Sequence, residues 1–165
     1  MSNTRIGFGG GCHWCTEAVF QSLRGVNKVE QGYIKSLAPH DSYSEAVVLS
    51  FEPSIIPLNV LIDVHLRTHS STSLHKLRGK YRSAVYVFSD VQADTVQRQI
   101  KTLQSDFEEP IVTTALQYDG FKLSLEHFQN YYRTNPEKPF CRVYIDPKLS
   151  KIRQQFGHYY DPAES

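Results

Sequence analysis

The sequence has little of several features that mark whole classes of protein. It has only three cysteines, Cys12, Cys15 and Cys141, an odd and sparse set that is not typical of a secreted disulfide framework. Its 18 Lys and Arg residues nearly cancel its 17 Asp and Glu residues, so its charge favours neither nucleic acid nor an anionic membrane as a partner. No apolar run approaches the roughly 18 residues that span a bilayer, and the N-terminus lacks the basic flank and apolar stretch of a signal peptide. We expect a cytoplasmic monomer with no nucleic-acid or membrane partner.

What is present is enough to build a core. The chain has 165 residues, of which 40% are hydrophobic and 12% aromatic, and this excludes a disordered polymer, a collagen-like fibre and a disulfide miniprotein. No repeat or low-complexity tract divides it. We therefore expect residues 1–165 to form a single domain.

Hydrophobic periodicity predicts the order of the elements. Period-2 segments at 5–8, 26–34, 45–51 and 83–88 predict strands, and helical spacing over 12–23 and after Pro57, the expected first helical residue, predicts two helices. The order βαββαβ is the ferredoxin-like α+β pattern. Beyond this core the sequence predicts an additional strand at 111–118 and helices over 90–107, with Asp90 as the N-cap, and over 146–156.

The chemistry concentrates where the first strand meets the first helix. Gly9, Gly10 and Gly11 permit a tight turn there, and Cys12 follows at the helix N-terminus. Unpaired N–H groups and the helix dipole favour an anion at that position, so the thiol of Cys12 is expected to ionise readily and to act as a nucleophile. The alternative interpretation is that Cys12 is a buried small residue and the glycines only make a turn.

The spacing Cys12-x-x-Cys15 leaves two further interpretations open. A C-x-x-C pair at the start of a helix is typical of thiol–disulfide oxidoreductases. It is also half of a zinc site, but zinc needs about four ligands and the sequence offers no second pair. His65, His69 and His75 show no ligand pattern and are interpreted as structural residues. We expect neither a metal nor a cofactor.

Read together, several motifs resemble one known family. The segment Gly9-Gly-Gly-Cys12-His-Trp14-Cys-Thr-Glu-Ala-Val-Phe20 is similar to the signature of the A-type peptide methionine sulfoxide reductases, which contains G-C-F-W. The resemblance covers about residues 5–156. Its other motifs, in order, are Gly32-Tyr33, Glu45-Ala-Val-Val48, His69, Tyr81-Arg-Ser-Ala84 and Asn135-Pro together with Phe140-Cys141. The family's fold is also ferredoxin-like.

The resemblance implies a reaction and its residues. Cys12 would attack the sulfur of the S-epimer of methionine sulfoxide in a peptide or protein and become a sulfenic acid. Glu45 would be the acid for the sulfoxide oxygen, kept protonated by burial, and the Tyr81 hydroxyl would hydrogen-bond that oxygen. Cys141, or alternatively Cys15, would condense with the sulfenic acid to a disulfide. Thioredoxin would then restore the thiols.

Each of these residues also has a structural interpretation. Glu45, on one strand face with Val47 and Leu49, could instead be the solvated end of the strand, and Tyr81 a core tyrosine. Cys141 alternates with Val143 and Ile145, which equally suits a buried inert thiol.

The sequence also departs from the family around the expected substrate pocket. The family has Phe where His13 stands, and Tyr43 is the only tyrosine available in a shortened loop before Glu45. The family's pocket aspartate is absent, and the basic residues Lys76, Arg78 and Lys80 occupy that region. We expect His13, Trp14 and Tyr43 to contact the substrate, with Trp14 packing on its S-methyl group.

Three hypotheses follow for the function. The first is methionine sulfoxide reduction by Cys12, Glu45 and Tyr81. The second is thiol–disulfide exchange by Cys12 and Cys15, which does not need Glu45. The third is a non-catalytic protein that binds methionine-rich or sulfoxide-bearing partners.

Overall fold

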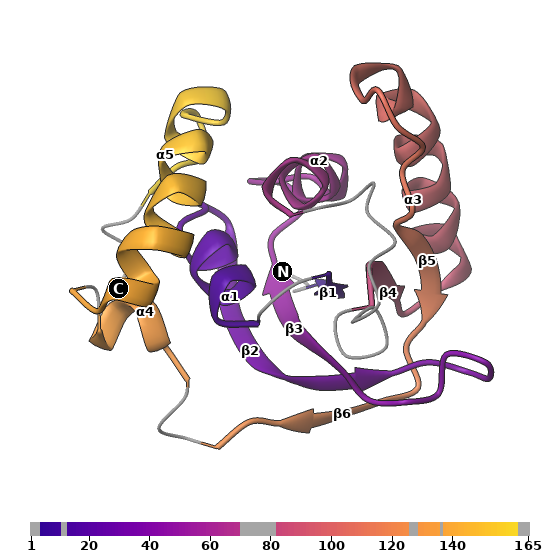
Figure 1. The fold of residues 1–165 in the computed structure, drawn as a ribbon. Coiled ribbons are helices and arrows are strands. Elements are labelled where there is room, and N and C mark those ends of the chain that lie inside the picture. Colours follow the sequence, from indigo (N-terminus) through magenta and orange to yellow (C-terminus); the bar gives the residue numbers. More distant parts are fainter. Residues whose placement is uncertain (1–3, 11–12, 70–81, 126–128, 136, 162–165) are drawn as a thin grey trace.

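The structure is a computed structural model, and it describes residues 4–10, 13–69, 82–125, 129–135 and 137–161. Two residues of the predicted catalytic set, Cys12 and Tyr81, lie outside this part of the chain, as does His75. Within it, six strands form one sheet in the order β5-β4-β1-β3-β2-β6 (Figure 1). The strands are β1 (Thr4–Gly9), β2 (Val26–Lys35), β3 (Ser44–Phe51), β4 (Ala84–Val87), β5 (Thr114–Gln117) and β6 (Gly120–Leu123).

The four central strands confirm the predicted ferredoxin-like pattern. Their order, β4-β1-β3-β2, is antiparallel throughout and places the first and third strands side by side at the centre. Helix α1 (His13–Gln21) connects β1 to β2, and helix α2 (Leu58–Thr68) connects β3 to β4. Both helices contribute to one hydrophobic core on the same face of the sheet, as expected of a split βαβ unit.

Alternation along β3 divides its side chains between two cores. Val47, Leu49 and Phe51 pack into the large core beneath α1 and α2, whereas Ala46 and Val48 join a smaller cluster on the opposite face. Because β3 is buried on both faces, it reads as an almost continuous apolar run. Glu45 shares the face of Val47 and Leu49, as the sequence predicted, and so points toward the helices.

Two helix starts differ from the prediction by one residue. Pro57 was expected to be the first helical residue, but its extended backbone makes it the N-cap of α2. Helix α3 (Asp90–Leu103) has Ser89 and not Asp90 as its N-cap, because the Ser89 hydroxyl accepts a hydrogen bond from the Gln92 N–H at 3.2 Å. The apolar residues of α3 face the core, with Val96 and Leu103 buried and Ile100 packed against it.

The C-terminal third is where the sequence prediction fails most. The strand expected over 111–118 is limited to β5, and two elements were not predicted, β6 and the short helix α4 (Tyr131–Thr134). The apparent alternation of Cys141, Val143 and Ile145 is wrong as a strand pattern, because Cys141–Ile145 is a π-helical turn that leads into helix α5 (Asp146–Gln155). Cys141 and Ile145 are therefore buried on one helical face, while Val143 is 61% exposed.

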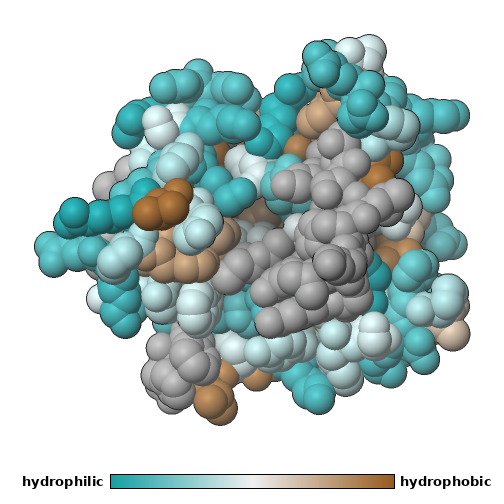
Figure 2. All heavy atoms as spheres, viewed as in Figure 1, coloured by the Kyte–Doolittle hydropathy of each residue, from teal (hydrophilic) through white to brown (hydrophobic). Residues whose placement is uncertain are grey.

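The surface offers no sign of a membrane-spanning element. None of the helices in the described ranges is long and apolar enough to cross a bilayer. On the face drawn in Figure 2, hydrophobic residues form separate small patches among polar ones. The corner where the sequence predicted the chemistry lies between the end of β1 and the start of α1.

Candidate active site

The turn that ends β1 packs against two histidines, His65 of α2 and His69, which directly follows α2. His65 Nε2 donates a hydrogen bond to the Gly9 carbonyl at 2.9 Å, and the His65 and His69 rings stack with centroids 4.1 Å apart. Gly10 has φ +152°, and a Cβ there would overlap the His69 ring. Only glycine adopts this conformation readily. Both the backbone of this turn and the His69 ring packed against it therefore require glycine at residue 10.

Further hydrogen bonds hold His69 beneath the turn. His69 Nδ1 donates to the His65 carbonyl, and its Nε2 accepts from the Ser83 hydroxyl at 2.9 Å. Ser83 in turn hydrogen-bonds Thr113 at 2.7 Å. Burial lowers the pKa of His65 well below its ordinary value, and neighbouring His69 adds to the effect. His65 is therefore neutral at physiological pH.

Glu45 lies at the N-terminus of α1, beside the position that Cys12 occupies in the sequence. Its Oε1 accepts a hydrogen bond from the His13 backbone N–H at 3.1 Å, and the carboxyl group is 7% exposed. A carboxylate at a helix N-terminus is stabilised by the dipole and by otherwise unpaired N–H groups. The structure therefore brings a buried acid and the start of α1 together, which two separate sequence motifs had suggested.

His13 contacts the same carboxyl group with its ring. The ring is buried, with Nε2 3.7 Å from Glu45 Oε1 and Nδ1 3.0 Å from the Gly32 carbonyl. Tyr33, which lies opposite Glu45 across the β2–β3 ladder, packs edge-on against the His13 ring at 5.3 Å between centroids. Gly32-Tyr33 is part of the family resemblance in the sequence, but neither residue had a predicted role. The pairing of Tyr33 with Glu45 on neighbouring strands is the signal that could have identified Tyr33.

Trp14 belongs to an aromatic cluster that joins α1 to the C-terminal segment. Its indole stacks on Tyr131 with centroids 4.1 Å apart and planes within 5°, and Phe140 meets it edge-on at 5.5 Å. Tyr131 therefore covers one face of the indole. Phe140 directly precedes Cys141, so this cluster brings the segment that carries Cys141 against the first turn of α1.

A buried carboxylate on α1 fixes Tyr131 in that cluster. Glu17, 1% exposed, accepts hydrogen bonds from the backbone N–H groups of Asn130 and Tyr131 at 2.8 and 3.1 Å and from Gln31 Nε2 at 2.7 Å. Burial raises the pKa of Glu17, and these donors oppose the rise. The sequence did not indicate this role of Glu17, because the hydrogen-bond partners of a single acid in a helix cannot be inferred from local spacing.

The two further cysteines both lie in the main core. Cys15 is 8% exposed, and Cys141 is a free thiol with no exposed surface. Burial raises the pKa of the Cys141 thiol, and the Asp146 carboxylate raises it further. A thiol in this state is a weak nucleophile until its surroundings change.

Tyr43 lies outside this cluster in the part of the chain that the structure describes. It is 40% exposed, and the ammonium group of Lys122 lies 4.2 Å from the centre of its ring. None of the described ring contacts joins Tyr43 to His13 or Trp14. The loop before Glu45 is instead held by Arg82, whose guanidinium donates to the Ser42 and Ile34 carbonyls at 3.0 and 3.2 Å.

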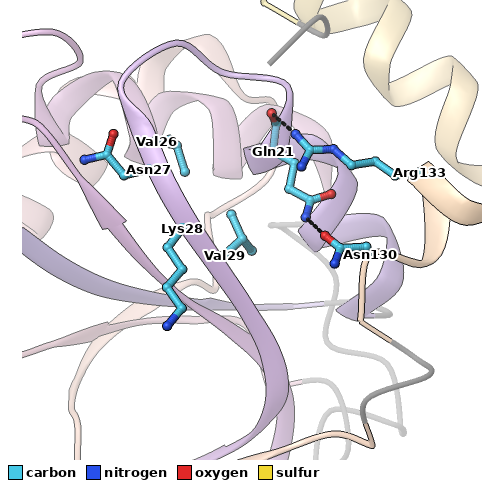
Figure 3. A pocket seen from close by; sticks show the side chains of 7 residues that line it. All are labelled: Gln21, Val26, Asn27, Lys28, Val29, Asn130 and Arg133. Atoms are coloured by element: carbon cyan, nitrogen blue, oxygen red, sulfur yellow. Dashed lines mark hydrogen bonds between the residues drawn. The ribbon is translucent and has the colours of Figure 1, made fainter. Parts of the chain in front are cut away.

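Among the described residues, no group of three or more His, Cys, Asp or Glu side chains is placed to hold a metal ion. A pocket of about 350 Å³ lies between the end of α1, the start of β2 and α4 (Figure 3). It contains no residue of the predicted site. On one side of it Gln21 Nε2 donates a hydrogen bond to Asn130 Oδ1, and the Gln21 backbone carbonyl accepts one from the Arg133 guanidinium.

Comparison with known proteins gives concordant results. A family model described as peptide methionine sulfoxide reductase matches residues 4–160. The peptide methionine sulfoxide reductase MsrA of Deinococcus radiodurans is 38% identical, over 91% of this chain and 81% of that protein. Mxr1 of Saccharomyces cerevisiae in reduced form has a similar fold, with a TM-score of 0.73, 22% identity and coverage of 86% of this chain and 91% of that one. Mxr1 in complex with Trx2 matches with a TM-score of 0.63 and 21% identity, over 78% of this chain and 84% of that one.

Proposed function

This chain belongs to the peptide methionine sulfoxide reductase family, and we propose that Cys12, Glu45 and Tyr81 carry its reaction, the reduction of the S-epimer of methionine sulfoxide to methionine. The chain is an oxidoreductase that uses thiols as its source of electrons. The residue roles rest on the motifs and on the geometry around α1.

The reaction divides into two steps. The Cys12 thiolate attacks the sulfoxide sulfur, the oxygen receives a proton from Glu45 and moves to the cysteine sulfur, and methionine leaves. The proton equals the one that the thiol lost, and the cysteine sulfur supplies the two electrons that reduce the sulfoxide, so this step needs no outside reductant. A second thiol then displaces the hydroxyl group of the sulfenic acid as water and forms a disulfide. In total, one sulfoxide and two thiols give one thioether, one disulfide and one water.

The observation that carries this assignment is the position of Glu45. Its carboxyl group is buried beneath the sheet-facing side of α1 and bonded to the N–H of the residue that follows Cys12. An acid within reach of the first helical turn is what protonation of a sulfoxide oxygen needs. Disulfide exchange between Cys12 and Cys15 has no use for it, and a protein that only binds sulfoxides needs no acid there.

Cys141 is the thiol that we propose for the second step. The contact between Phe140 and Trp14 supports this choice, since it places the residue before Cys141 against the residue two positions after Cys12. Cys15 lies three residues from Cys12, and disulfides between Cα atoms about 4.4 to 6.8 Å apart are feasible across such a turn. Both cysteines lie in the core, so the choice of Cys141 rests on the contact between Phe140 and Trp14.

We propose thioredoxin as the reductant that reopens the disulfide and the cytoplasm as the compartment. Support comes from the solved complex of the structurally similar Mxr1 with Trx2 and from the sparse, odd number of cysteines in this chain.

The test is a peptide that carries one methionine sulfoxide of defined configuration. With dithiothreitol, the wild-type protein should convert the S-epimer and leave the R-epimer, and Cys12→Ser should convert neither. Mass spectrometry of the protein after one turnover without reductant should show a disulfide between Cys12 and Cys141. Conversion of neither epimer by the wild type would overturn the proposed function, and a Cys12–Cys15 disulfide would reassign only the second thiol.

A further inference from the structure

The imidazole of His13 is oriented by one hydrogen bond and faces the Glu45 carboxyl group with its other nitrogen. Nδ1 lies 3.0 Å from the Gly32 carbonyl oxygen. A carbonyl oxygen only accepts hydrogen bonds, so Nδ1 carries a proton, and in the neutral ring Nε2 is unprotonated. Nε2 is the nitrogen that lies 3.7 Å from Glu45 Oε1. A basic nitrogen therefore stands beside the acid in a site shielded from water.

The same carboxyl oxygen already accepts a hydrogen bond from the protein. The backbone N–H of His13 donates to Oε1 at 3.1 Å from the first residue of α1. Both this N–H and the helix dipole stabilise negative charge on the carboxylate.

Among the described residues, other ionisable side chains near this pair come from β2, β6 and α1. Tyr33 packs edge-on against the ring from β2, and Lys122 of β6 lies opposite Tyr33 across the β2–β6 ladder. Glu17, one turn further along α1, accepts three hydrogen bonds of its own. Cys12 precedes His13 in the sequence, outside the described residues.

We infer that His13 and Glu45 hold the transferable proton together, with His13 as a positioning residue that resupplies Glu45. The inference rests on the proposed function of the corner. The pair holds the one proton that the thiol gives up, and this proton rests on His13 Nε2, opposite an ionised Glu45. When the sulfoxide oxygen is protonated, the same proton moves from Nε2 to the Glu45 carboxylate and from there to the oxygen, and the imidazole returns to its neutral form. The proton count of the first step is unchanged.

The test compares two variants with the wild type in single turnovers. Reduced protein is mixed with a peptide bearing the S-epimer, without reductant, and methionine formation is followed from pH 5.5 to 8.5. His13→Asn keeps an N–H that can donate to the Gly32 carbonyl but lacks the titratable nitrogen, and His13→Phe fills the site without either. An imidazolium holds its proton to a higher pH than a carboxyl group does. We expect the ratio of wild-type to variant rate constants to rise about tenfold between pH 5.5 and 8 for both variants.

Other roles of His13 would produce different profiles. If the imidazole only fixes the structure, His13→Asn should match the wild type at every pH, and this result would overturn the inference. If His13 only helps Cys12 to ionise, the ratio should fall as pH rises, which would also overturn it. His158→Asn, a change at an exposed histidine, is the matched control and should show a ratio of one throughout.

A second arm asks whether the effect passes through Glu45. In a Glu45→Gln background, His13→Asn should change the slower rate by the same factor at every pH, because the pair no longer exists. A ratio that still rises with pH in that background would contradict the inference. Methionine formation by the wild type establishes the proposed function independently, so a flat His13 profile and a failed reductase assay are separate results.

Discussion

The corner between β1 and α1 and the segment after residue 129 both pack on α1, but they are held there in different ways. The corner is part of the central sheet: β1 pairs with β3 and β4 on its two sides, and His65 hydrogen-bonds the Gly9 carbonyl from below. The C-terminal segment forms no strand of that sheet among its described residues. Near α4 it is attached chiefly by the Glu17 carboxylate and by the ring stack of Trp14 with Tyr131. Its far end is held by two backbone hydrogen bonds, from the Arg24 N–H to the Tyr159 carbonyl at 2.7 Å and from the Asp161 N–H to the Ser22 carbonyl at 2.6 Å.

This difference suits the two halves of the proposed cycle. The first step needs an acid at a fixed distance from the nucleophile, and a sheet strand that is buried on both faces supplies a fixed position. The second step needs a buried thiol to approach another sulfur, and a segment that forms no strand of the sheet among its described residues can shift without breaking the sheet's hydrogen bonds. Stiff and adjustable parts of one site are thus built from different kinds of contact.

The sharpest way to test the corner is Glu45→Gln. The amide keeps the shape and can still accept the His13 N–H through its carbonyl oxygen, but it cannot donate a proton as an acid. We expect single-turnover methionine formation to slow by about 10² to 10³-fold, as is typical for loss of a general acid. Thermal unfolding should change little. An unimpaired rate would instead favour the thiol–disulfide exchange hypothesis, which does not need this acid.

The attachment of the C-terminal segment is tested by Glu17→Ala. The change leaves three donors without their acceptor, the N–H groups of Asn130 and Tyr131 and the Gln31 amide, so the free energy of unfolding should fall by about 2 to 3 kcal/mol. The first turnover should persist, while steady-state recycling by dithiothreitol or thioredoxin should slow. Denaturant unfolding and the two rates measure this. Glu108→Ala, at an exposed glutamate, should stay within about 0.5 kcal/mol of the wild type. Equal slowing of the first turnover and of steady-state recycling would show that the corner and the C-terminal segment do not act separately in the two steps.

The smallest expected effect concerns the histidine beneath the corner. Because burial lowers the pKa of His65 in the folded state, the unfolded chain binds a proton below about pH 6.5 that the folded chain does not. The free energy of unfolding should therefore fall as the pH drops from about 6.5. His65→Gln retains an N–H near the Gly9 carbonyl and removes the titration, so its loss of stability between pH 7 and 5 should be smaller by about 1 to 2 kcal/mol. Parallel curves for the two proteins, with His158→Gln as control, would contradict this account.

The split βαβ core could be predicted from the sequence because its signals are local. Alternation along β3 and helical spacing along α1 depend only on neighbouring residues, and both were recovered, including the face on which Glu45 lies. Residues 141–145 could not be assigned in this way. In a stretch of five residues, burial of the first and last fits a strand and a helical turn equally well, and only the exposure of Val143 distinguishes them.

Contacts between distant elements were equally out of reach. Tyr131 reaches Trp14, and Glu17 reaches Asn130, across more than 110 positions of sequence. Nothing in the spacing of either segment predicts these pairs. The ring of His13 was recognised as a departure from the family pattern, but its bond to Gly32 and its approach to Glu45 depend on how α1 crosses β2 and β3.

The complete burial of Cys141 has a consequence for the chain under oxidative attack. Peroxide in the surrounding water cannot reach this sulfur while the π-helical turn stays closed, and the high thiol pKa withholds the reactive anion even then. The sulfur would therefore remain reduced through episodes that consume accessible thiols elsewhere in the cell. Under the proposed function, the chain would enter the period after such an episode with the thiol for its second step intact.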